Sequence, residues 1–158
     1  MITWYEDDKL GIFFDAIPCV GVRYILPSHT SSEKASIKRY PFICRKALQV
    51  KLIDNIKQKN YEFIIPKDYC FDGASIPKMF WRIIGSPTDN EFLIPALVHD
   101  VLCENHKYID NDRQFSSEVF NALLIVSDVS KFKRFLMKNS VNIFQSLFCD
   151  WGLEYNNG

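Results

Sequence analysis

The sequence contains no apolar run long enough to cross a bilayer and no secretory signal. A membrane-spanning helix requires about 20 predominantly apolar residues, and the longest apolar runs of this 158-residue chain are far shorter. The first ten residues, MITWYEDDKL, carry acidic side chains where a signal peptide carries basic ones. We therefore expect a protein that is made and kept in a cytoplasm.

Paired cysteines are also missing. The five cysteines are odd in number and form no Cys-x-x-Cys pair, whereas structural zinc sites usually have such short spacings. A core of this size needs no disulfide framework. The sequence therefore predicts free thiols that pack as small apolar groups. These residues are Cys19, Cys44, Cys70, Cys103 and Cys149.

The chain has no excess charge of either sign, with 19 basic and 19 acidic residues. Non-specific nucleic-acid binding needs a basic field, so the sequence gives no strong nucleic-acid signal, although a small local basic patch is not excluded. Hydrophobic residues make up 47% of the chain, and its length is close to that of a common domain. We expect one domain over residues 1–158, with residues 1–47 as a variable N-terminal part and 48–148 as the core.

The first 47 residues have an irregular pattern. Gly11–Phe14 and Val20–Leu26 are rich in β-branched and aromatic residues and are predicted strands. The polar tract Pro27–Lys34, which follows the second of these strands, is predicted to be a loop. For Ser36–Ala47 the pattern does not decide between helix and coil.

A β-hairpin is predicted next. Val50–Ile53 and Tyr61–Ile65 flank the polar turn Lys57–Asn60, and Pro66 ends the second strand. A turn is expected at Asp72-Gly73, because glycine adopts the positive φ that a sharp reversal needs.

The remaining sequence predicts about four helices. The first begins with Ser75 as its N-cap and ends at Gly85; the second follows a capping box at Thr88–Glu91, with Pro95 marking a kink or a late start. Two more are expected over Asn111–Val126 and Val129–Phe148 from apolar spacing. Strands followed by helices predict an α+β fold, with N-terminal antiparallel strands and a C-terminal helical bundle.

His99 and Asp100 lie in the second of these helices, which is apolar almost all round. Polar groups in a buried helix need partners to offset their desolvation. Cys103 lies one turn after His99 on the same face, and His106 follows about another turn later. The pair is either a structural dyad that ties helices together or part of a functional site.

Asp112 heads the apolar stripe of the third predicted helix. An anion is favoured near a helix N-terminus, so Asp112 is either the N-cap or, if Asp110 caps instead, free to serve a site. Asp72 is equally consistent with a turn former, and Ser75 with a helix cap. No Gly-x-Ser-x-Gly motif surrounds Ser75, which argues against a nucleophilic serine.

A divalent metal site is the functional interpretation of these residues. Neutral imidazole with two or three carboxylates suits zinc, manganese or iron, and a bound metal generates hydroxide near neutral pH. The His99-Asp100 doublet resembles that of the HD-type phosphohydrolases. Those enzymes also use an upstream histidine, and here only the loop residue His29 precedes the doublet.

The segment from Ile65 to Pro77, the doublet His99-Asp100 and the run Asp112–Phe115 together resemble the signature of a phage- and prophage-associated family of unknown function. That family shows a DGASIP segment, an apolar helix that ends in His-Asp, and a D-x-x-F helix start. This chain departs from it at Asp68 and Phe71, and Lys107 stands near the place of a usual arginine. The resemblance implies a phage or mobile-element origin and supplies no activity.

Taken together, these features favour a small metal-assisted hydrolase that acts on a cell-wall peptide or a phosphoester, in the host cytoplasm or associated with a virion. A zinc or manganese ion would be held by Asp72, His99, Asp100 and Asp112, with His99, Asp100 and Ser75 as the catalytic residues. The alternative is a non-catalytic virion, tail or secretion-system component whose polar cluster is structural.

A third interpretation is a host-defence binder with a phage or host protein as its partner. Such a binder would show an exposed aromatic patch. The candidate residues are Trp4, Tyr5, Phe13 and Phe14.

Overall fold

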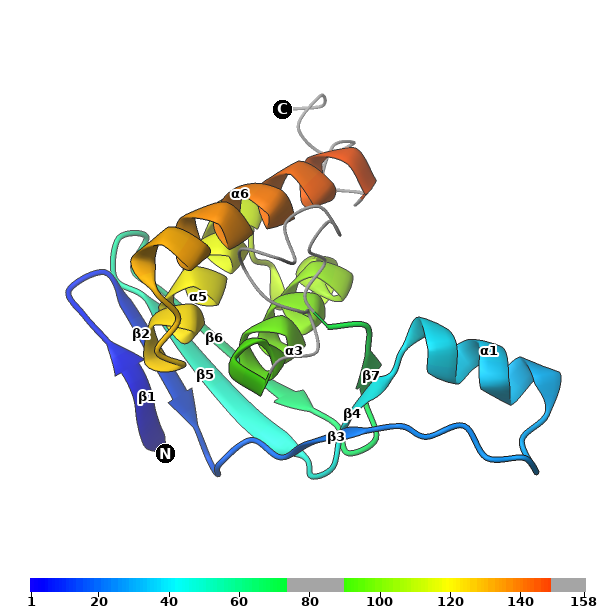
Figure 1. Cartoon of the computed structure of the whole chain (residues 1–158). Helices are drawn as coiled ribbons and strands as arrows, with labels where there is room; N and C mark the ends of the chain where they lie inside the picture. The colour runs from blue at the N-terminus through cyan, green and yellow to red at the C-terminus, as the bar shows by residue number, and fades with distance from the viewer. Residues whose placement is uncertain (74–89, 149–158) are drawn as a thin grey trace. The chain divides into compact units, whose positions relative to one another are not determined.

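The computed structural model of the chain describes residues 1–73 and 90–148. Contacts divide the chain into two compact units, residues 1–73 and residues 74–158. All the strands that the structure describes, and one helix, lie in the first unit, and the described part of the second unit contains helices (Figure 1). The predicted α+β class, with antiparallel strands followed by helices, is confirmed. The expectation of a single domain stays a prediction.

A four-stranded antiparallel sheet forms the larger part of the first unit. The predicted hairpin is present, and each of its strands begins two residues earlier than expected, while the first also ends one residue later. In its first strand Leu48, Val50 and Leu52 are buried and alternate with more exposed residues, which is the two-residue period of a strand with one face on a core. The sheet has the order β1-β2-β5-β6, with β1 Ile2–Glu6, β2 Leu10–Phe14, β5 Leu48–Asp54 and β6 Lys59–Ile65.

A second, three-stranded antiparallel sheet has the order β3-β4-β7, with β3 Val20–Val22, β4 Phe42–Cys44 and β7 Cys70–Phe71. The predicted strand Val20–Leu26 thus ends at Val22. After β7 the chain reaches Gly73, whose φ of 88° confirms the positive φ predicted there.

Helix α1, Ser31–Arg39, connects β3 to β4 (Figure 1). The prediction of a loop over Pro27–Lys34 is therefore wrong in its second half. A capping box starts the helix: Thr30 Oγ1 accepts the Glu33 N–H at 3.2 Å, and the Glu33 carboxylate accepts the Thr30 N–H at 2.6 Å.

The described part of the second unit contains α3 Asn90–Glu104, α4 His106–Ile109, α5 Arg113–Val126 and α6 Lys131–Phe148. Helix α3 runs through Pro95, so this proline does not mark the helix start. The last two helices agree with the predicted bounds to within two residues. The helix predicted from Ser75 to Gly85 and the cap at Thr88 lie outside the described residues.

Several apolar side chains are placed differently from their predicted roles. Phe14 is fully buried, and Trp4, Tyr5 and Phe13 are half-buried, so these four do not form the exposed patch expected of a binder. In α6, Phe132 and Phe135 are exposed while Met137 is buried. No helix in the described part of the chain is long and apolar enough to cross a membrane. Of the five cysteines, the four that are described are free thiols.

Candidate functional site

His99 is buried inside the second unit, where its helix α3 packs against α5. It lies on α3, only 7% of it is exposed, and its ring packs against Phe120 of α5 with 5.0 Å between centroids. Burial lowers the pKa of His99 from 6.5 to about 4, because the charged imidazolium loses its hydration. The imidazole is therefore neutral at pH 7.

Asp100 follows His99 on α3 and brings a carboxylate close to the ring. Its Oδ1 lies 4.0 Å from His99 Nδ1, which is longer than a hydrogen bond. Because the imidazole is neutral at pH 7, this approach is not an ion pair there. The carboxylate would favour a protonated ring, but desolvation outweighs that attraction.

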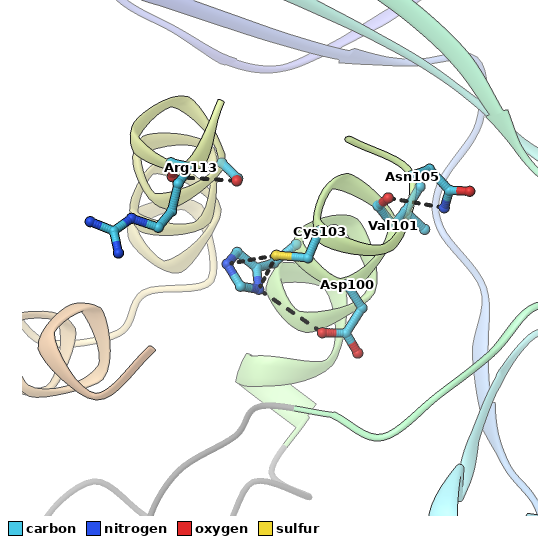
Figure 2. A network of polar contacts seen from close by, with 7 residues as sticks. Asp100, Val101, Cys103, Asn105 and Arg113 are labelled. Atoms are coloured by element: carbon cyan, nitrogen blue, oxygen red, sulfur yellow. Dashed lines mark hydrogen bonds and ion pairs between the residues drawn. The ribbon is translucent and has the colours of Figure 1, made fainter. Parts of the chain in front are cut away.

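Cys103 lies one helical turn after His99, and Figure 2 shows its sulfur directed at the ring. The Sγ atom is 3.8 Å from Nδ1 and 3.6 Å from Nε2. The sulfur is therefore at similar distances from both ring nitrogens and is not directed at one of them alone. This weak contact between a thiol and the imidazole adds to the packing around His99.

Asp112 is the N-cap of α5. Its Oδ1 accepts the Phe115 N–H at 2.7 Å, which satisfies one of the unpaired amides of the first turn. The alternative in which Asp110 caps this helix is wrong, because Asp110 ends α4 in the left-handed conformation. Asp112 lies eight residues before Phe120, about two turns along α5 from the contact with His99.

The described structure does not place the other two expected site residues, Asp72 and Ser75, relative to His99. Asp72 belongs to the first unit, where it is exposed next to Gly73, and Ser75 lies outside the described residues. Within residues 1–73 and 90–148, no three or more His, Cys, Asp or Glu side chains form a group that could hold a metal ion. Of the expected residues, His99 and Asp100 lie together on α3, and Cys103, which was not one of them, lies one turn later.

Two residues of this region were not part of the predicted site. Phe120 forms one wall of the His99 environment, and a contact between helices leaves no local pattern in the sequence. Asn111 is 6% exposed, and its Oδ1 has no hydrogen-bond partner among the described residues. Buried amide oxygens usually have a hydrogen-bond partner, so this one is unusual. The only sequence signal for Asn111 was its position directly before the N-cap of α5.

The capping role of Asp112 predicts a stability change. Asp112→Ala should lower the free energy of unfolding by about 1 kcal/mol, because the Phe115 amide loses its acceptor. Urea denaturation followed by circular dichroism would measure this. Asp112→Asn should retain most of the stability, since asparagine caps helices equally well. Gln114→Ala, an exposed change in the same turn, is the matched control. If Asn and Ala destabilise equally, the carboxylate has another task.

Comparison with known proteins places most of this region in one family. A family model described as "Protein of unknown function (DUF1353)" matches residues 47–141. This range includes β5, β6 and the His99 region, and it leaves out the first 46 residues. A 48-residue segment is 40% identical to "Uncharacterized protein y4jT" of Sinorhizobium fredii, covering 30% of this chain and 14% of that protein. No solved structure matches the chain.

Proposed function

Because the chain belongs to the DUF1353 family of proteins of unknown function, we propose that it is a non-catalytic component that acts through its surface. The observation that carries this proposal is that two central members of the expected site already have structural tasks. His99 is buried against Phe120, and Asp112 caps α5. Each task explains its polar side chain without a substrate.

The protonation state of His99 supports the same conclusion. With a pKa near 4, the imidazole is a weak base at neutral pH, whereas an efficient general base has a pKa close to the operating pH. A side chain that is only 7% exposed also offers little surface to a substrate. The ring suits the packing of α3 on α5 better than proton transfer.

The origin of the protein is part of this proposal. The DGASIP segment, the His99-Asp100 doublet and the Asp112–Phe115 run resemble a phage- and prophage-associated signature. We therefore assign the chain to a phage or related mobile element, as a component that works in the host cytoplasm or in the virion. Its partner would then be a phage or host structure that contacts the exposed surface.

A metal-assisted hydrolase is the second candidate, and one observation favours it. A neutral imidazole can bind a divalent cation without first losing a proton, and the Asp100 carboxylate lies 4.0 Å from it. His99 and Asp100 would hold zinc or manganese, with further ligands needed from the expected residues Asp72 and Asp112, and Ser75 would position the substrate. When bound, such a metal supplies a hydroxide nucleophile near neutral pH.

Metal analysis separates the two candidates. The full chain, purified without chelator, would be analysed for zinc and manganese and assayed with bis-p-nitrophenyl phosphate and cell-wall peptide. Asp100→Asn preserves shape while removing the charge, and Glu104→Gln, one turn later on α3, is the matched control. We expect no stoichiometric metal and no turnover above the blank in all three proteins.

The opposite result would establish the hydrolase. In that case the wild type and Glu104→Gln would each contain about one metal ion per chain and would hydrolyse a substrate. Asp100→Asn would lack both the metal and the hydrolysis. Because neither substitution deletes the His99 ring, such a loss would report the site and not the packing of α3 on α5.

A further inference from the structure

We propose that residues 17–46 form a surface that binds an anionic lipid membrane without spanning it. This segment, which contains β3, α1 and β4, lies in the first unit and before the range matched by the family model. The proposal does not depend on whether the His99 region is catalytic, because it uses none of those residues.

The first observation is a group of exposed apolar side chains. The exposed fractions are 72% for Ile17, 41% for Val22, 73% for Tyr24, 43% for Ile25 and 51% for Leu26. Isolated exposed apolar residues are ordinary on protein surfaces. Five within ten residues of sequence are unusual, and clustered exposed apolar groups mark interaction sites.

The direction of these side chains favours lipid over a protein groove. Tyr24, Ile25 and Leu26 are consecutive and all exposed. These three residues belong to no helix or strand, and consecutive side chains do not all point to one side, so one face of a partner would cover only some of them. A loop that enters the headgroup region is surrounded by apolar material on several sides, and consecutive exposed apolar residues suit that environment.

The second observation is charge. Residues 17–46 contain six basic side chains and only one acidic one, Glu33, which gives them a net charge of +5. The rest of the chain carries the other 13 basic and 18 acidic residues, a net charge of −5. Although the net charge of the whole chain is zero, this segment is basic and therefore complementary to anionic lipid headgroups. The six basic residues are Arg23, Lys34, Lys38, Arg39, Arg45 and Lys46.

These positive charges are not neutralised within the described part of the chain, where none of the six forms an ion pair. Arg23 donates to the Tyr40 carbonyl at 3.0 Å, and Arg45 donates to the Val22 carbonyl at 3.2 Å, so both keep their charge. Glu33 is held by the capping box with Thr30. The positive field therefore remains available to a partner.

The loop also satisfies backbone groups that would otherwise be costly to place against lipid. The Leu26 N–H donates to His29 Nδ1 at 2.9 Å, and the His29 N–H donates to the Leu26 carbonyl at 3.1 Å. This closed turn follows directly after the apolar residues. It allows their side chains to approach a membrane with fewer exposed amides.

Single-stranded nucleic acid also recognises basic surfaces, but it is favoured by aromatic side chains on which bases stack. Of the five exposed apolar residues only Tyr24 is aromatic, and the four aliphatic residues match acyl chains instead. The combination of basic and aliphatic groups is typical of peripheral membrane binding.

Vesicle co-sedimentation with the full chain tests the proposal. We expect at least about ten-fold stronger partitioning onto vesicles of phosphatidylcholine with one-third phosphatidylglycerol than onto phosphatidylcholine alone, and a loss of binding as salt rises. The triple variant Tyr24→Ser, Ile25→Ser, Leu26→Ser should weaken binding by about ten-fold. The double charge reversal Lys38→Glu, Lys46→Glu should do the same.

The matched controls make the same kinds of substitution outside residues 17–46. Ile56→Ser changes a 65% exposed isoleucine in the β5–β6 turn, and Lys131→Glu reverses an exposed charge at the start of α6. Both should bind like the wild type. The proposal is overturned if neither vesicle binds, if both bind equally, or if the two segment variants bind like the wild type. Binding of a mixed-sequence RNA oligonucleotide in place of vesicles would assign the surface to nucleic acid and also overturn it.

Discussion

The His99→Ala variant is expected to unfold with a free energy about 3 kcal/mol below that of the wild type. The substitution removes a buried ring that contacts Phe120 and leaves a cavity between α3 and α5. Well-packed interiors collapse only partly around such a cavity. For a chain of this length the loss corresponds to a decrease of about 9 °C in the unfolding midpoint.

Calorimetry and urea titration at pH 7 would measure this change. His99→Phe is the informative companion, because it restores an aromatic ring against Phe120 without any titratable nitrogen. We expect it to recover more than half of the stability lost in His99→Ala. If His99→Ala stays within about 0.5 kcal/mol of the wild type, as a surface substitution would, the ring does not hold the helices together.

The elements with strong periodicity were predictable from the sequence. The alternation in β5 and β6 and the apolar spacing in α5 and α6 gave both their type and their approximate bounds. Helix α1 was missed because only Ile37 of its nine residues is buried, so no apolar period was present. The Thr30–Glu33 capping box was the remaining local signal for this helix.

The burial of His99 could be predicted because it depends on a single element. An apolar sequence on both sides of His99 indicated a buried histidine, and the structure places it there. The role of Asp112 depended on which of two nearby aspartates caps α5, and helix starts are not determined from sequence to one residue. Phe120 could not be identified because it reaches His99 only after α3 and α5 pack together.

The exposed surface was the least predictable feature. Phe13 and Phe14 were candidates for an exposed patch, but Phe14 on the inner strand β2 is fully buried, and its ring packs against Trp4 with 5.2 Å between centroids. Ile17, Tyr24 and Leu26 occur in an equally apolar stretch, yet they lie outside the strands and stay exposed. Which apolar segments are covered depends on the packing between elements, which the sequence did not reveal.

Stability should fall as the pH is lowered through the range set by His99. The folded protein holds this imidazole with a pKa of about 4, whereas its ordinary pKa is 6.5. Between these values the unfolded chain takes up a proton that the folded chain does not, so protonation favours unfolding. The contribution of His99 is complete above pH 6.5, decreases as the pH falls toward 4, and totals about 3 kcal/mol.

Unfolding free energies of the wild type and of His99→Phe at pH 7, 5.5 and 4.5 would isolate this contribution. Carboxylates titrate in both proteins, so their effect cancels in the difference between the two curves, while only the wild type has the imidazole. We expect the wild type to lose more stability than the variant between pH 7 and 4.5. Parallel curves would mean that folding leaves the pKa of this imidazole unchanged, as it would for a hydrated ring, and would contradict the effect of burial.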